Sequence, residues 1–242
     1  MRVVALGLAA VATACGGGAA SDGGPCARGA RLTIQVVRDG DAHSTLMAQH
    51  ADAAGPGVRG GEEAWSASLA GMSDAMMLQL GARLHAATAR HVDRYVRAAD
   101  EATLAAFVAN QAPPPAATTL VLGRVEAPGD RGDAPYWRTY LVESAPIVDT
   151  GAITDVRRGR DPITNRPLLV LTFTAAGRAA LGDATTRLIG HKLAVTLDDH
   201  VVVAPVIAEP ITGGGLNVPL SDEAFANDAM TRLACVATPR RQ

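Results

Sequence analysis

The residues best suited to chemistry are the consecutive Asp198, Asp199 and His200. Carboxylates beside an imidazole can hold a metal ion or act as a general acid and base, as in a hydrolase. Two acidic residues between apolar runs are equally typical of a solvated hairpin turn, and this is the interpretation that we favour. The glycine run at 213–215 lacks the lysine and the helix start that a phosphate-binding loop requires.

Other candidate sites are weaker. His85 and His91 are six residues apart and do not share a helix face well, so they do not predict a metal site. The tripeptide Arg131-Gly132-Asp133 lies in a stretch rich in glycine and proline and is interpreted as chance. The sequence contains no phosphate-binding, esterase, zinc-protease or C-x-x-C signature. We therefore expect no catalytic residue, no metal ligand and no cofactor, and a protein that is not an enzyme.

The composition excludes two further classes of protein, disordered chains and nucleic-acid-binding proteins. Of the 242 residues, 48% are apolar and 19% are charged, which is enough apolar material for a core and excludes wholesale disorder. The net charge is −2, and the two Trp, three Tyr and three Phe are too few to build stacking platforms for bases. Nucleic-acid binding is therefore not expected.

The N-terminus predicts export. Met1-Arg2 is followed by an apolar run to Ala14 and then by Cys15, a pattern for a signal peptide over residues 1–14. The small residues 12–14 before Cys15 resemble a bacterial lipobox, which predicts lipidation at Cys15; the alternative is an ordinary signal peptide cut at the same A-x-A site. Residues 15–30 are interpreted as a flexible tether. The expected location is the cell envelope, lipid-anchored to a membrane and facing the periplasm.

Two cysteines remain besides Cys15. Cys26 and Cys235 lie at the two ends of the globular part, in a compartment that permits disulfides. A bridge between them would close a loop of roughly 200 residues, worth about 4 to 5 kcal/mol on entropic grounds. The alternative is two separate buried thiols.

Periodicity and turn residues predict a first unit over residues 31–127. It contains strands at 31–37 and 119–125 and helices at 74–91 and 101–110, the second capped by Asp100. Residues 92–98 are interpreted as a further strand; the alternative is a continuation of the helix at 74–91. Residues 39–71 show weak periodicity and are predicted to be a long loop with at most one short helix.

A second unit is predicted over residues 136–236. Its strands are expected at 136–142, 168–174, 191–197 and 201–207, with a helix from the cap at Thr174 to Gly190. A mobile loop at 213–215 and a last helix capped by Ser221 follow. The fold class predicted is α+β, with mixed or antiparallel sheets and helices packed on one face.

The second unit resembles a known family. The strings LTFTAAG at 171–177, LIGHKLAVTLDDHVVVAPVI at 188–207, EPITGG at 209–214 and SDEA at 221–224 are similar to the periplasmic P1 head of the protein-export subunit SecD. DTGAITDV at 149–156 is similar to the lead-in to that head. The positions that match are Phe173, Gly177, Gly190, Leu193, Ala194, Leu197, Asp198, Ala204, Pro205, Val206, Ile207, Ile211, Gly213, Gly214, Glu223 and Ala224.

The resemblance has departures. The family usually has glycine or Asn-Gly in the hairpin where this chain has Asp199 and His200, so non-glycine residues must adopt positive φ there or the turn must be longer. Leu181 stands where a phenylalanine is common. Residues 31–127 are similar to the family's P1 base in outline only.

The resemblance implies a fold, a partner class and a role. It implies structural roles for Gly177, Gly190, Asp198, Ala204-Pro205 and Gly213-Gly214. It also implies affinity for translocating or unfolded polypeptide in support of protein export, with the Sec export machinery as a further partner. No run after residue 14 is apolar enough to span a membrane, so the motor activity of the family is not expected. The alternative is a docking module for a single envelope partner.

Overall fold

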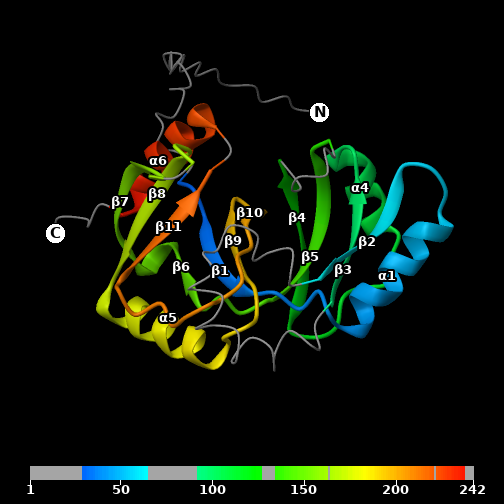
Figure 1. The fold of residues 1–242 in the computed structure, drawn as a ribbon, viewed down its shortest axis with the longest axis horizontal. Coiled ribbons are helices and arrows are strands. Elements are labelled where there is room, and N and C mark those ends of the chain that lie inside the picture. Colours follow the sequence, from blue (N-terminus) through cyan, green and yellow to red (C-terminus); the bar gives the residue numbers. More distant parts are fainter. Residues whose placement is uncertain (1–28, 65–91, 127–133, 163, 221, 238–242) are drawn as a thin grey trace, which may run out of the picture.

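The computed structural model describes residues 29–64, 92–126, 134–162, 164–220 and 222–237, and over these residues it confirms the α+β fold class (Figure 1). The helices are α1 (Ala42–Ala53), α4 (Glu101–Ala109), α5 (Ala175–Arg187) and α6 (Glu223–Ala237), with a short 3₁₀ helix η3 (Thr150–Ala152). The strands are β1 (Leu32–Val36), β2 (Val58–Ala64), β3 (Val92–Ala98), β4 (Thr118–Val125), β5 (Tyr136–Glu143), β6 (Val148–Asp149), β7 (Ile153–Arg160), β8 (Pro167–Phe173), β9 (Leu193–Leu197), β10 (His200–Val203) and β11 (Gly215–Pro219).

The strands form two sheets. The larger has eight strands in the order β2-β3-β5-β4-β10-β9-β1-β6, and the smaller has three in the order β11-β8-β7. Within these sheets only β4 and β10 pair in parallel, over the two residue pairs Leu122–His200 and Gly123–Val201. The larger sheet thus joins strands from before residue 127 to strands from after residue 136.

Five strands of the larger sheet form a closed ring. β1 pairs with β9, β9 with β10, β10 with β4, and β4 with β5. The circuit closes where Val37, directly after β1, forms an antiparallel bridge with Val142 of β5. The neighbouring Arg38 N–H donates to the Leu141 carbonyl at 2.7 Å. We refer to these five strands as the ring.

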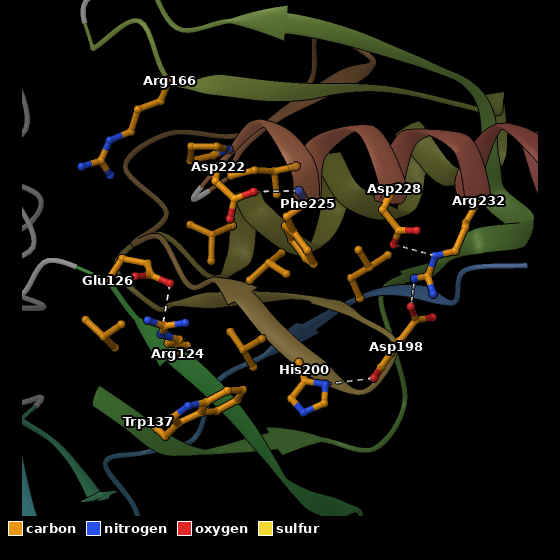
Figure 2. A pocket seen from close by; sticks show the side chains of 17 residues that line it. Arg124, Glu126, Trp137, Arg166, Asp198, His200, Asp222, Phe225, Asp228 and Arg232 are labelled. Atoms are coloured by element: carbon orange, nitrogen blue, oxygen red, sulfur yellow. Dashed lines mark hydrogen bonds and ion pairs between the residues drawn. The ribbon is translucent and has the colours of Figure 1, made fainter. Parts of the chain in front are cut away.

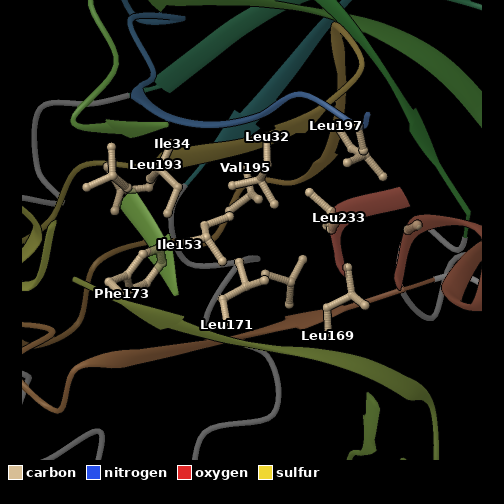
Figure 3. Packing of buried hydrophobic residues seen from close by; sticks show 14 of the residues in the cluster. Leu32, Ile34, Ile153, Leu169, Leu171, Phe173, Leu193, Val195, Leu197 and Leu233 are labelled. Carbon is tan, nitrogen blue, oxygen red and sulfur yellow. The ribbon is translucent and has the colours of Figure 1, made fainter. Parts of the chain in front are cut away.

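Three apolar clusters follow from this closure. The ring interior is filled by a small cluster of Val37, Tyr140, Val142, Ala194 and Val201. Because side chains alternate along a strand, the outward residues of β1 and β9 face a second cluster, which residues of the three-stranded sheet, α5 and α6 complete (Figure 3). The outward residues of β4 and β5 face a third cluster that α1 and α4 cover (Figure 1).

Several strands and helix caps lie where the sequence predicted them. β1, β3, β4, β5 and β8 lie within one or two residues of the predicted strands. Asp100 caps α4 by accepting from the Thr103 N–H at 2.8 Å, and Thr174 caps α5 by accepting from the Gly177 N–H at 3.0 Å. These signals are local, since each cap contacts a residue three positions ahead.

Other elements differ from the sequence predictions. The region 39–71 holds a full 12-residue helix, α1, and a strand, β2, that was not predicted. β2 reads VRGGEEA and lacks alternation, so its pairing with β3 forms it rather than its own propensity. Gly215 begins the unpredicted strand β11 instead of completing a mobile loop. The predicted helix at 74–91 and the cap Ser221 lie outside the described residues, and Asp222 caps α6 by accepting from the Phe225 N–H at 2.8 Å.

The contact between β4 and β10 depends on a glycine. A Cβ at Gly123 would lie 2.7 Å from the Val201 carbonyl oxygen and 2.8 Å from the Tyr140 ring. We expect Gly123→Ala to force these strands apart and to lower the free energy of unfolding by about 1–3 kcal/mol, measured by urea denaturation. Gly213→Ala is the matched control, because a Cβ there meets nothing within 4 Å. Equal stability of the two variants would contradict the prediction.

Candidate functional site

A cavity of about 750 Å³ opens on the outside of the ring, between β4, β5 and β10 on one side and β11 and α6 on the other (Figure 2). We call it the cleft. Its lining residues are Arg124, Val125, Glu126, Trp137, Arg166, Leu197, Asp198, His200, Val201, Val202, Val203, Pro219, Leu220, Asp222, Phe225, Asp228 and Arg232. The cleft forms where the second and third apolar clusters separate.

The inner surface of the cleft is apolar. Val202 and Val203 of β10 are half-buried and line it, and Phe225 projects into it from α6 (Figure 2). Trp137 of β5 stands on the opposite wall, with its ring edge-on to His200 at a centroid distance of 5.5 Å. Both aromatic side chains therefore present part of their surface to a cavity large enough for side chains of a bound chain.

Charged residues of both signs surround this apolar surface. Arg124 forms an ion pair with Glu126 at 3.1 Å. At the far end Arg232 of α6 contacts the carboxylate of Asp198 and lies 3.1 Å from that of Asp228 (Figure 2). Arg232 thus ties helix α6 to the hairpin between β9 and β10. A rim of mixed charge around an apolar base favours no single sign of ligand charge.

The hairpin at 198–200 is a tight turn. Asp198 has φ +49° and Asp199 has φ +68°, as a two-residue hairpin of type I′ requires. The sequence predicted that non-glycine residues in this turn would adopt positive φ, and Asp198 and Asp199 do so. The Asp198 carboxylate accepts from the Arg31 N–H at 2.9 Å, whereas His200 Nε2 contacts Glu101 Oε1 at 2.8 Å. Asp199 is exposed and lies 3.8 Å from Arg31.

The contacts of Asp198 and His200 can be compared with the hypotheses of an acid–base pair in a hydrolase and of a metal site. The Asp198 and His200 side chains have different partners, and the imidazole contacts the Asp198 carbonyl rather than its carboxylate, at 3.2 Å. Among the described residues, no group of three or more His, Cys, Asp and Glu is arranged to hold a metal ion. The contacts of Asp198 instead position the hairpin against α6 and the start of β1.

The residues of the family motif occupy structural positions. Gly190 has φ +91° just after α5, and its N–H donates to the Ile207 carbonyl at 2.9 Å. A Cβ at Gly177 would lie 3.0 Å from that of Ala152, so this glycine permits close packing of α5 on η3. Gly214 has φ +80° and packs against the Arg178 side chain, and Gly213 precedes it in the open.

The Ala204-Pro205 pair continues the chain after β10. The Leu193 N–H donates to the Pro205 carbonyl at 3.0 Å, which extends the pairing with β9 beyond a bulge at 201–203. The loop at 213–215 lies at the end of β11 opposite to Pro219, which lines the cleft. The glycine loop and the cleft thus lie at opposite ends of β11.

The cysteine predictions are not tested by the described residues. Cys15 and Cys26 lie outside them, and Cys235 belongs to the last turns of α6. Lipidation at Cys15 and a bridge between Cys26 and Cys235 remain predictions. Of the cleft residues, sequence reasoning missed Trp137 and Arg232. The i, i+4 spacing of Asp228 and Arg232 was a visible signal, but their contact with the hairpin was not.

The tie between α6 and the hairpin can be measured. We expect Arg232→Gln to lower the free energy of unfolding by about 1–2 kcal/mol, because Asp198 loses a partly buried charged partner. Arg157→Gln, which removes an exposed ion pair with Asp155, is the control and should cost about 0.5 kcal/mol or less. A double-mutant cycle with Asp198→Asn that shows no coupling energy would exclude the tie.

Comparisons with known proteins locate the similarity in the second half of the chain. Residues 127–233 match the family model described as SecDF, P1 head subdomain. The protein translocase subunit SecD of Desulfurispirillum indicum is 37% identical over 82 residues, which are 34% of this chain and 16% of that protein. SecD of Acetobacter pasteurianus is 28% identical over 102 residues, 42% of this chain and 18% of that protein. The chain thus spans less than a fifth of the length of these relatives.

A solved structure is also similar. The structure reported as "Structure and function of a membrane component SecDF that enhances protein export" matches with 19% identity and a TM-score of 0.38, over 86% of this chain and 94% of that one. Within the described residues, the helices are all too short or too polar to cross a membrane. From the family match and the SecD relatives, we conclude that residues 127–233 of this chain are similar in sequence to the SecDF P1 head subdomain.

Proposed function

We propose that this protein binds translocating or unfolded polypeptide in the cleft and thereby supports protein export. The observation that carries the proposal is a cavity of about 750 Å³ that combines apolar lining residues with a charged rim and is lined in part by the segment similar to the SecDF P1 head. Unfolded chains expose apolar side chains that folded proteins bury, and a half-open apolar cavity lowers their free energy by removing that surface from water. The proposal assigns binding only, with no reaction and no motor activity, since the matched segment is a head subdomain.

The contacts within the cleft suit an adaptable ligand. Val202, Phe225 and Trp137 offer surface without a directed polar contact, so side chains of different shape can be accommodated. Arg124 is paired with Glu126, and Arg232 is paired with Asp198 and Asp228, so these rim charges balance one another and do not select one sign of ligand charge. Such a site is suited to many sequences rather than to one.

Binding can be tested with one variant and a matched control. We expect wild-type protein to bind unfolded apolar peptides with a Kd of about 1–10 μM, measured by fluorescence anisotropy. Val202→Asp places a charge on the cleft base and should weaken binding at least about tenfold. Leu46→Asp is the control, because Leu46 is an exposed leucine on α1, outside the cleft. Circular dichroism confirms that both variants are folded.

Two kinds of result would contradict polypeptide binding in the cleft. No binding near 100 μM, or equal loss in both variants, would refute the cleft as a polypeptide site. A photoreactive residue at position 202 identifies ligands in cells: many exported chains in the adducts support the proposal. A single recurring partner, such as a component of the export machinery, would instead make the protein a docking module.

We further propose that Cys15 is lipidated and that residues 15–30 tether the protein to a membrane on its periplasmic side. The support is the small-residue tract before Cys15 and the glycine-rich stretch after it. We expect Cys15→Ser to move the protein from the membrane fraction to the soluble periplasmic fraction, detected by immunoblot. Cys26→Ser is the control and should remain in the membrane fraction. Loss of wild-type protein from membranes in a salt wash would contradict lipid anchoring.

A further inference from the structure

Five ionisable side chains lie at one end of the ring. Asp39 follows β1, Glu63 is on β2, Asp93 on β3, Arg138 on β5, and Lys192 precedes β9. We call them the charge cluster. Arg138 has the same strand parity as Tyr140, and Lys192 the same as Ala194, so both cations share the face that fills the ring.

The contacts in the charge cluster are short and shielded from water. Arg138 donates to Asp39 at 2.6 Å and to Glu63 at 2.8 Å. Lys192 contacts Glu63 at 2.7 Å and Asp93 at 2.6 Å. The Asp39 and Arg138 side chains are 1% and 3% exposed, and that of Lys192 is 4% exposed. Water therefore provides almost no screening for these three groups.

Aromatic rings enclose the guanidinium. The Arg138 Cζ lies 3.6 Å from the centroid of Tyr95 and 4.3 Å from that of Tyr140. Burial raises the pKa of Tyr140 to about 12, so this phenol stays neutral at any physiological pH. The rings stabilise the cation through their π faces and add no negative charge.

The charge cluster contains three carboxyl groups and two cations. Within these five groups the carboxyl groups outnumber the cations by one, and protonation of one buried carboxyl group removes this excess of negative charge in a region of low dielectric constant. Asp39 is the most buried of the three carboxyl groups. Burial raises the pKa of Asp39 to about 7; repulsion by Asp93 adds to this, whereas Arg138, the Leu141 N–H and Lys192 oppose it.

Asp39 also lies on the seam that closes the ring. Its Oδ1 accepts from the Leu141 N–H of β5 at 2.7 Å, and its carbonyl accepts from the Arg94 N–H of β3 at 3.0 Å. Leu141 in turn accepts from Arg38, next to the closing bridge. We propose that the charge cluster is a proton-dependent latch, in which the closed seam holds one proton and opening of the seam releases it.

The direction of the effect follows from linkage. When the seam opens, water reaches Asp39 and its pKa returns toward the ordinary value of 3.8, whereas in the closed seam it is about 7. The closed form therefore binds the proton more tightly, and the latch is tightest at low pH. The opening constant should rise about tenfold for each pH unit between about 4 and 7, and should level off above 7.

The latch is tested by comparing wild type with Asp39→Asn, which keeps the shape and removes the proton. Hydrogen exchange at the Leu141 and Arg94 amides, corrected for intrinsic rates, reports seam opening. Between pH 5 and pH 7 we expect the ratio of the wild-type to the variant opening constant to rise about 50-fold. Asp41→Asn is the matched control: Asp41 caps α1 nearby, and asparagine caps as well. Its profile should follow that of wild type.

Two results would overturn the latch. One is an opening constant with the same pH dependence in wild type and Asp39→Asn. The other comes from wild type alone, which keeps the test valid if Asp39→Asn does not fold. Carboxyl ¹³C resonances followed by NMR should show one aspartate titrating near pH 7, and titration of every aspartate below pH 5 would exclude a proton held by Asp39.

Discussion

The structure depends on one backbone contact, the bridge between Val37 and Val142 that closes five strands into the ring. Closure gives the ring an interior, which Val37, Val142, Ala194 and Val201 fill beside Tyr140. It also turns the outer faces of β1 and β9 away from those of β4 and β5. Two separate apolar clusters result, and the cleft is the space where they diverge along β10.

The interior of the ring changes character along its axis. At one end Thr33, Gln35 and Thr196 are buried and contact one another or backbone, so polar groups there are satisfied by neutral partners. At the other end the charge cluster uses fully ionisable groups. Trp137 and Arg138 are adjacent on β5 and point to opposite faces, the first to the cleft and the second to the charge cluster. Movement of β5 therefore affects both.

The sequence allowed prediction of features that short-range contacts specify. The caps Asp100 and Thr174 and the turn at Asp198-Asp199 contact residues within a few positions, and the family motif located the head-like segment. β2 was not predicted because its own residues do not favour a strand, and it forms through its pairing with β3. The charge cluster was not predicted because its members are far apart: Asp39 and Arg138 are separated by 99 residues, and Glu63 and Lys192 by 129. The cleft could not be predicted for the same reason, because its walls come from β4 and α6, which are far apart in the sequence.

The pairings of β1 have a consequence for the order of folding. Leu32 pairs with Leu197 of β9, and on its other edge Ile34 pairs with Val148 of β6, so both strand partners of β1 follow it by more than a hundred residues. The entropy cost of closing such long loops comes before the contacts that reward it, and this sheet therefore forms more slowly than a sheet of consecutive hairpins.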